Sequence, residues 1–204
     1  MIYAEVDGSM ILTDDGWREV KLGRVFGSAD IAQGKAKERG QGIEKSCYAA
    51  HLGGHQVFCQ RMAALIEPYR PLDDRLIFLS DGARWIEKWI TKTYPNATQI
   101  LDFYHAVSHL SAFSEDVFAD KLQRQLWVEE QKTLLLEAKL ETLIAAIRKV
   151  RRNRSKTLKQ KARTLIGYYL ENRTRMAYDH YLEKGYYIGS GAIESAHRTV
   201  VHRR

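Results

Sequence analysis

The sequence predicts an α/β fold in which a mixed sheet is flanked by helices and an all-helical insertion precedes the last helix. Three observations lead to this expectation: alternating apolar residues near the start, a continuous apolar run further along, and a long later stretch almost without proline or glycine. A chain of 204 residues suffices for one large domain or for a core with one sizeable insertion.

Three antiparallel strands are expected first. Apolar and polar residues alternate over 2–7 and again over 17–26, with an Asp-Gly turn signal at 13–16, so these segments predict a hairpin. Residues 46–51 predict a third strand. The intervening segment 27–43, rich in glycine and charged residues, predicts a mobile loop.

The rest of residues 1–103 predicts helix, strand, helix and strand in that order. Apolar positions over 56–66 suit one face of a helix. The run at 75–80 is continuously apolar after Arg75, which is typical of a central strand covered on both faces. A helix over 83–93 and a short strand over 98–103 complete this expected core.

Residues 104–188 predict a helical insertion. Proline and glycine nearly vanish up to about residue 181, and leucine and isoleucine recur at helical spacing between Leu134 and Ile147. The glycines from Gly185 onward end this zone. The core is expected to resume over 189–204 with one last helix that carries Glu194.

The composition favours a polyanionic partner. The formal net charge is +7 and the pI is about 9.4, which favours nucleic acid. No apolar run approaches the ~20 residues of a membrane span, and the start lacks the pattern of a signal peptide, so we expect a cytoplasmic protein without a membrane partner. The two cysteines, Cys47 and Cys59, form no CxxC pair and are expected to be buried free thiols.

Three acidic residues are placed where a divalent metal site would need them. Asp7 ends the first expected strand, Asp81 ends the apolar strand, and Glu194 lies in the first turn of the last helix. Carboxylates at strand ends can hold Mg²⁺ for phosphoryl transfer on DNA. The alternative is local: both Asp-Gly pairs also suit turns, and Glu194 also suits a helix cap.

Four short motifs resemble, in order, the successive signatures of DDE-type insertion-sequence transposases. The similarity is greatest to the Mutator-like superfamily, and within it to the Kra-type group, and it spans nearly the whole chain. The motifs are Val6-Asp7-Gly8-Ser9, Leu79-Ser80-Asp81-Gly82-Ala83, Leu101-Asp102-Phe103-Tyr104-His105-Ala106 and Gly189-Ser190-Gly191-Ala192-Ile193-Glu194-Ser195.

The resemblance implies a ribonuclease H-like fold in which Asp7, Asp81 and Glu194 form the catalytic triad and bind Mg²⁺ or Mn²⁺. Asp102 and His105 match an Asp-x-x-His motif of the family and are candidate accessory residues. A helical insertion between the second and third acids is typical of the group. The implied mechanism is hydrolysis at a transposon end, followed by attack of the freed 3′-hydroxyl on target DNA.

The resemblance also implies a place of action and partners. These are transposon-end and target DNA, bound by a homo-oligomer at the bacterial nucleoid in the cytoplasm. Such transposases carry an amino-terminal region that binds the DNA ends. Here the first catalytic strand begins at Met1, and the chain stops at Arg204 within the expected last helix. We therefore expect a fragment that lacks that region and the carboxyl-terminal end.

A dense basic run follows the leucine-rich segment and contains no acidic residue. Such a run predicts nonspecific phosphate contacts that weaken steeply with salt, whereas the alternative is a solvated helix face or a charged turn between helices. The run consists of Lys149, Arg151, Arg152, Arg154, Lys156, Lys159, Lys161 and Arg163. The DNA-binding candidates are Arg151, Arg152, Arg154, Lys156, Lys159 and, near Glu194, Arg198.

Two further signals have competing interpretations. His105 and His109 have the i, i+4 spacing of zinc ligands, but no third ligand stands out. We expect His109 to be an ordinary polar residue, and His105 either to lie near the triad or to form a structural hydrogen bond with Asp102. Trp127 suits base stacking but is expected in the core.

Two other functions stay open on the sequence alone. One is a nuclease of the same fold that does not join strands. The other is a catalytically inactive remnant that only binds DNA or a partner; the retention of all three acids argues against it.

Overall fold

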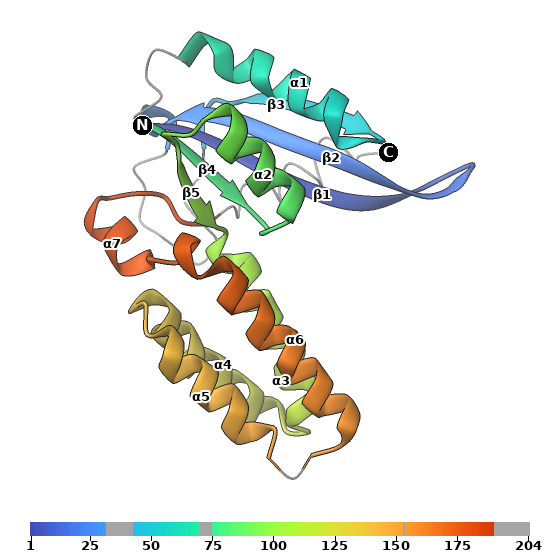
Figure 1. Cartoon of the computed structure of the whole chain (residues 1–204), viewed down its shortest axis with the longest axis vertical. Helices are drawn as coiled ribbons and strands as arrows, with labels where there is room; N and C mark the ends of the chain where they lie inside the picture. Colours follow the sequence, from blue (N-terminus) through green and yellow to red (C-terminus); the bar gives the residue numbers. More distant parts are fainter. Residues whose placement is uncertain (32–42, 70–74, 153, 190–204) are drawn as a thin grey trace. The chain divides into compact units, whose positions relative to one another are not determined.

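The computed structural model describes residues 1–31, 43–69, 75–152 and 154–189 (Figure 1). The chain divides into two compact units, here called the sheet unit (Met1–Asp102, with Gly189) and the helical unit (Phe103–Ile188). Glu194, Arg198 and the expected last helix lie outside the described residues, as does most of the expected loop over 27–43. None of the helices in the described ranges has the length and apolar character needed to cross a bilayer.

The sheet unit contains a five-stranded mixed sheet, which confirms the expected class and the order of its elements. The strands lie in the order β3-β2-β1-β4-β5. The β1–β2 and β2–β3 pairs are antiparallel, and the β1–β4 and β4–β5 pairs are parallel. Their bounds are β1 (Ile2–Thr13), β2 (Gly16–Gly27), β3 (Cys47–Leu52), β4 (Leu76–Ser80) and β5 (Thr98–Leu101).

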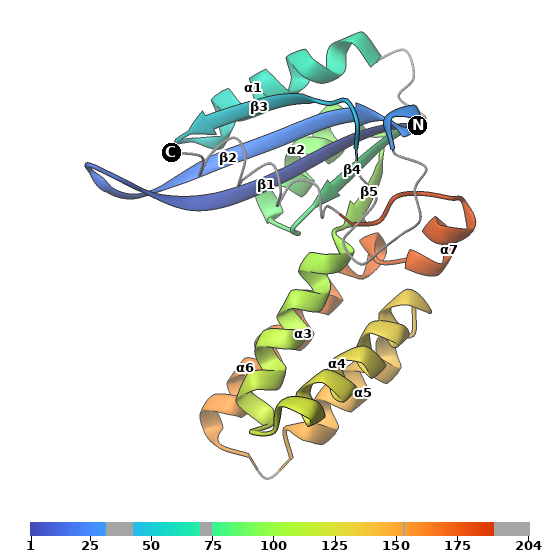
Figure 2. The ribbon, with the colours of Figure 1, turned by 180° about the vertical axis from the view of Figure 1, so that it is seen from behind.

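The β1–β2 hairpin is longer than the sequence predicted. Its ladder runs from Ile2 opposite Gly27 to Thr13 opposite Gly16, so the expected turn at 13–16 is confirmed, with Gly16 at a φ of 98°. The hairpin extends beyond the rest of the sheet (Figures 1 and 2). Asp7 therefore lies inside a strand and not at its end. The proposed Asp7-Gly8 turn is wrong, because Gly8 pairs with Lys21 in the ladder.

Two helices, α1 (His55–Ile66) and α2 (Arg84–Thr93), cover one face of the sheet. Their apolar faces meet alternate residues of the strands. The shared core includes Ile2, Ala4, Val6, Val25, Phe58, Met62, Ile66, Leu76, Phe78, Ile86 and Ile90. A Cβ atom at Gly23 of β2 would lie 2.0 Å from the Sδ atom of Met62, so a larger residue there would require the Met62 side chain of α1 to shift.

Because side chains alternate along a strand, the residues between these core positions lie on the opposite face. On β1 they are Tyr3, Glu5 and Asp7, and Arg24 of β2 lies directly opposite Glu5. This second face carries the charged side chains of Glu5, Asp7 and Arg24.

The helical unit confirms the predicted helical patterning. It contains α3 (Phe103–Val117), α4 (Lys121–Leu136), α5 (Leu140–Val150), α6 (Lys156–Asn172) and α7 (Tyr178–Glu183). The first four form a bundle in which each helix contacts the next and α6 returns to α3 (Figure 2). The expected strand over 98–103 ends earlier, at Leu101, because Phe103 already begins α3.

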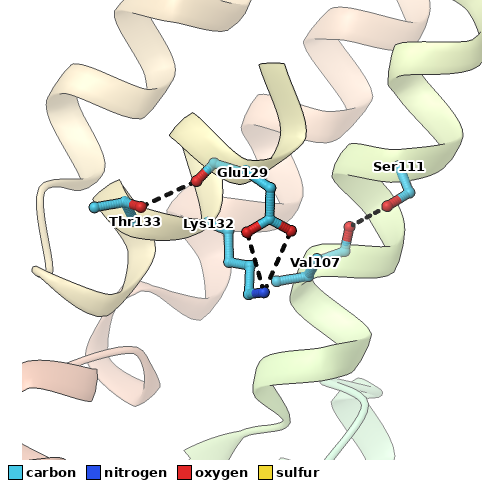
Figure 3. A network of polar contacts seen from close by, with 5 residues as sticks. All are labelled: Val107, Ser111, Glu129, Lys132 and Thr133. Atoms are coloured by element: carbon cyan, nitrogen blue, oxygen red, sulfur yellow. Dashed lines mark hydrogen bonds and ion pairs between the residues drawn. The ribbon is translucent and has the colours of Figure 1, made fainter. Parts of the chain in front are cut away.

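Short-range contacts define the ends and surfaces of the bundle helices. The side chains of Asp120 and Ser155 cap α4 and α6 by accepting a hydrogen bond from a backbone N–H. On α4, Lys132 contacts the carboxylate of Glu129 (Figure 3). Trp127 is buried against Phe113 and Phe118, which confirms its expected place in the core.

The two cysteines are free, as expected, but they differ in exposure. Cys59 of α1 is buried, and burial raises the pKa of its thiol to about 11. Cys47 is exposed at the start of β3, so the expectation that both thiols are buried is wrong for Cys47. The position of Cys47 explains this difference, because β3 lies at the edge of the sheet.

Candidate functional site

Three aspartates follow the last paired residues of three adjacent parallel strands. Val6 of β1 pairs with Ser80 of β4, and Ser80 pairs with Leu101 of β5. Asp7, Asp81 and Asp102 occupy the next position on each strand. The register therefore brings their backbones together where the parallel pairing ends, at the carboxyl-terminal side of the sheet, which is called the acidic edge below. The backbone N–H of Asp102 donates to the carbonyl of Ser80 (2.8 Å), which joins the two strand ends directly.

Local hydrogen bonds orient two of these carboxylates. The Oδ1 atom of Asp81 accepts the backbone N–H of Ala83 (2.9 Å), and Gly82 between them has a φ of 91°. The turn interpretation of Asp81 is therefore confirmed, and the turn leads directly into α2. The Oδ1 atom of Asp7 accepts the N–H of Gly8 (2.8 Å) within the strand. A local bond to one oxygen is compatible with a cation at the carboxylate.

Glu5 is a fourth acid at this edge that the sequence analysis did not select. It shares a face of β1 with Asp7, its side chain is fully buried, and neither carboxylate oxygen accepts a hydrogen bond within the described residues. Burial raises the pKa of Glu5 to about 8; the nearby Arg24 opposes this shift, and Asp102 and Asp7 add to it. The sequence alternation gave no sign of this, because Glu5 occupies an ordinary polar position and its burial appears only in the folded sheet.

Arg24 is a cation beside these acids, directly opposite Glu5 in the β1–β2 ladder. It is buried opposite Glu5, and its Nη2 atom lies 3.5 Å from the carbonyl of Ile43. Its guanidinium also lies over the rings of Phe26 and Tyr48, at 5.4 and 5.5 Å from their centroids. A fixed positive charge here offsets part of the repulsion among the carboxylates.

Two residues of the expected triad, Asp7 and Asp81, follow neighbouring paired positions of β1 and β4. Glu194 lies outside the described residues. Among the residues that the structure describes, no group of three or more histidine, cysteine, aspartate or glutamate side chains is arranged to hold a metal ion. Asp102 belongs to the sheet unit and His105 to the helical unit.

His109 was expected to be an ordinary polar residue, but it makes close contacts with two other side chains. Its Nε2 atom lies 3.2 Å from the Nε2 atom of His105, and its ring centroid lies 4.2 Å from that of Tyr168 on α6. Burial, and after it the charge of His105, lower the pKa of His109. The two histidines therefore form one structural feature of the helical unit.

The basic run spans the end of α5, the loop after it and the start of α6. Arg152, Arg154, Lys156 and Lys159 are exposed and Arg151 is partly exposed. Lys161 instead forms an ion pair with Asp116 of α3 (2.6 Å). The alternative of a charged turn between helices describes this conformation, and exposure leaves the side chains accessible to phosphates.

No protein-family model matches this chain, and neither does any curated protein. The chemistry of the acidic edge therefore carries the functional argument. Carboxylate oxygens are the ligands that Mg²⁺ and Mn²⁺ prefer, and the ends of parallel strands are the usual place for such sites in α/β folds.

Proposed function

We propose that this chain is the catalytic part of a DDE-type insertion-sequence transposase with a ribonuclease H-like core. The observation that carries the proposal is the register that puts Asp7 and Asp81 at neighbouring positions of β1 and β4. The order of three antiparallel strands followed by two parallel ones supports this core. The motif resemblance supplies the family.

Asp7, Asp81 and Glu194 would hold Mg²⁺ or Mn²⁺, and the donor set fits, because two hard carboxylates stand at one sheet edge. When bound, such an ion supplies charge stabilisation at the reacting phosphate. The carboxylates of Asp7 and Asp81 would bind this ion, and the hydrogen bonds they accept from the N–H groups of Gly8 and Ala83 orient them.

The other candidate residues have supporting roles. Asp102, almost fully buried and hydrogen-bonded through its backbone to Ser80, supports the edge on which Asp7 and Asp81 stand. His105 is an accessory residue of the family motif. DNA phosphates are held by Arg151, Arg152, Arg154, Lys156, Lys159 and Arg198, in a homo-oligomer on transposon-end and target DNA at the bacterial nucleoid.

The test is metal-dependent cleavage of DNA by the chain and by Asp7→Asn and Asp81→Asn. Each substitution removes a charged metal ligand, so we expect cleavage to fall by more than the ~10–100-fold typical of outer-shell changes. Asp15→Asn is the control, because Asp15 is exposed at the hairpin tip, where it forms an ion pair with Arg18 (3.7 Å). Equal cleavage by all four proteins would contradict the proposal.

Two products separate the transposase from its alternatives. Joining of a 3′-hydroxyl end to a second DNA identifies strand transfer, whereas cleavage alone indicates a nuclease of the same fold. Salt-sensitive DNA binding without cleavage in Mg²⁺ or Mn²⁺ indicates an inactive remnant.

A further inference from the structure

Two imidazole nitrogens approach each other closely on the helical unit. His105 and His109 lie one turn apart on α3, both partly buried, with their Nε2 atoms 3.2 Å apart and their ring planes nearly perpendicular, at 80°. The spacing i, i+4 puts both side chains on one face of the helix. Both residues belong to the same helix, so the helix backbone sets the spacing of the pair.

This separation equals the edge of a tetrahedral metal site. Two nitrogens that each lie ~2.0–2.1 Å from a zinc ion at the tetrahedral angle are about 3.3 Å apart. A direct hydrogen bond between neutral rings also fits 3.2 Å, but it requires one ring nitrogen to be protonated and the other to be bare.

The surroundings hold His109 in place. Tyr168 of α6 packs on the ring of His109. Beside them lies a cavity of about 440 Å³ within the helical unit, lined in part by His109, Tyr168, Asp116, Lys161 and Thr164. Water molecules can complete the coordination of an ion that has two protein ligands.

We propose that His105 and His109 bind one divalent transition-metal ion of the zinc class. Imidazole nitrogen selects Zn²⁺, Ni²⁺ and Cu²⁺ over Mg²⁺, which prefers oxygen. The lowered pKa of His109 also keeps its ring neutral and able to ligate near pH 7. The site shares only His105 with the proposed transposase, and Zn²⁺ binding is measured separately from DNA cleavage, so either proposal can fail without the other.

The experiment is a titration of the metal-free chain with Zn²⁺ alone, by calorimetry and by competition with a chromophoric chelator. We expect one equivalent to bind, and His105→Gln and His109→Gln each to weaken it by more than about tenfold, since each removes a ligand. The control is the double variant His51→Gln/His55→Gln, which alters the other closely spaced histidines and should bind as the unaltered chain does.

Three results would overturn the proposal: no tight equivalent of Zn²⁺, binding unchanged in both single variants, or binding lost in the control. Thermal melting of the metal-free variants shows whether they fold. A second measurement needs no variant: the Cu²⁺ complex of the unaltered chain should show two imidazole nitrogens in its paramagnetic resonance spectrum. A spectrum with one or none contradicts the site even if a variant misfolds.

Discussion

Glu5 and Arg24 lie directly opposite each other on β1 and β2, and both side chains are buried. The two carboxylate oxygens of Glu5 have no hydrogen-bond partner among the described residues. The Nε atom of Arg24 has none either. A buried carboxyl group without such bonds is costly, and most costly when it is ionised. The fold therefore keeps an unfavourable acid beside Asp7, at the edge where the proposed metal ligands stand.

The first prediction concerns stability and pH. The pKa of Glu5 is about 8 in the folded chain against an ordinary 4.5, so the folded state binds more protons than the unfolded state between these values. The free energy of unfolding must then fall as pH rises through this window. Relative to Glu5→Gln, we expect the unaltered chain to lose on the order of 4 kcal/mol between pH 4.5 and 8.

The measurement is urea unfolding of both proteins in metal-free buffer at several pH values. Glu129→Gln is the control, because Glu129 is exposed and pairs only locally with Lys132; its stability difference should stay within about 0.5 kcal/mol. A difference between the chain and Glu5→Gln that does not change with pH would show that Glu5 is ionised in the fold.

The second prediction tests the packing of α1 on the sheet. A Cβ at Gly23 would lie 2.0 Å from Sδ of Met62 and 3.0 Å from Phe58, both buried, so Gly23→Ala should destabilise the chain by about 1–3 kcal/mol. The matched control is Gly167→Ala in α6, where the added Cβ would have no atom within 4 Å apart from its own helix backbone. This substitution should stabilise the chain by up to about 1 kcal/mol. Thermal or urea unfolding measures both, and equal signs would refute the packing argument.

The third prediction concerns the basic run. If Arg152 and Arg154 each contact a phosphate, the double alanine variant should reduce the slope of log binding constant against log salt by about 1.8, at ~0.9 per contact. The control removes the same charge from α2, as Lys88→Ala/Lys92→Ala, both exposed. Filter binding across a salt series measures the slopes. An equal change in both variants would mean a general charge effect and no localised contact.

Much of the fold could be predicted from the sequence because its signals are local. The alternation in β1 and β2, the apolar run of β4 and the helical spacing after residue 103 each depend on neighbouring residues alone. The hairpin length could not be predicted. Past Asp7 its strands are held mainly by cross-strand pairs such as Leu12 with Trp17, which alternation within one strand does not specify.

The site was predictable to a smaller degree. Asp7 and Asp81 stand out because each follows a run of strand-forming residues, and strand register puts them at neighbouring positions. Glu5 looked like an ordinary polar partner in an alternating strand; its significance comes from burial, which arises when the sheet forms. The contact of His109 with Tyr168 joins α3 to α6 across 59 positions of sequence, and no local pattern indicates it.

The last prediction tests the link between α3 and α6. The hydroxyl of Tyr169 is fully buried and donates to the carbonyl of Ala106 (2.7 Å); burial holds the pKa of Tyr169 well above its usual range, so the donor keeps its proton at alkaline pH. Tyr169→Phe removes this bond but retains the ring. Because such bonds contribute ~0.5–1.5 kcal/mol, we expect a loss of about 1 kcal/mol in urea unfolding. Tyr104→Phe, at an exposed ring of α3, should change stability by less than about 0.5 kcal/mol. Equal losses would show that the bond between the helices contributes nothing net.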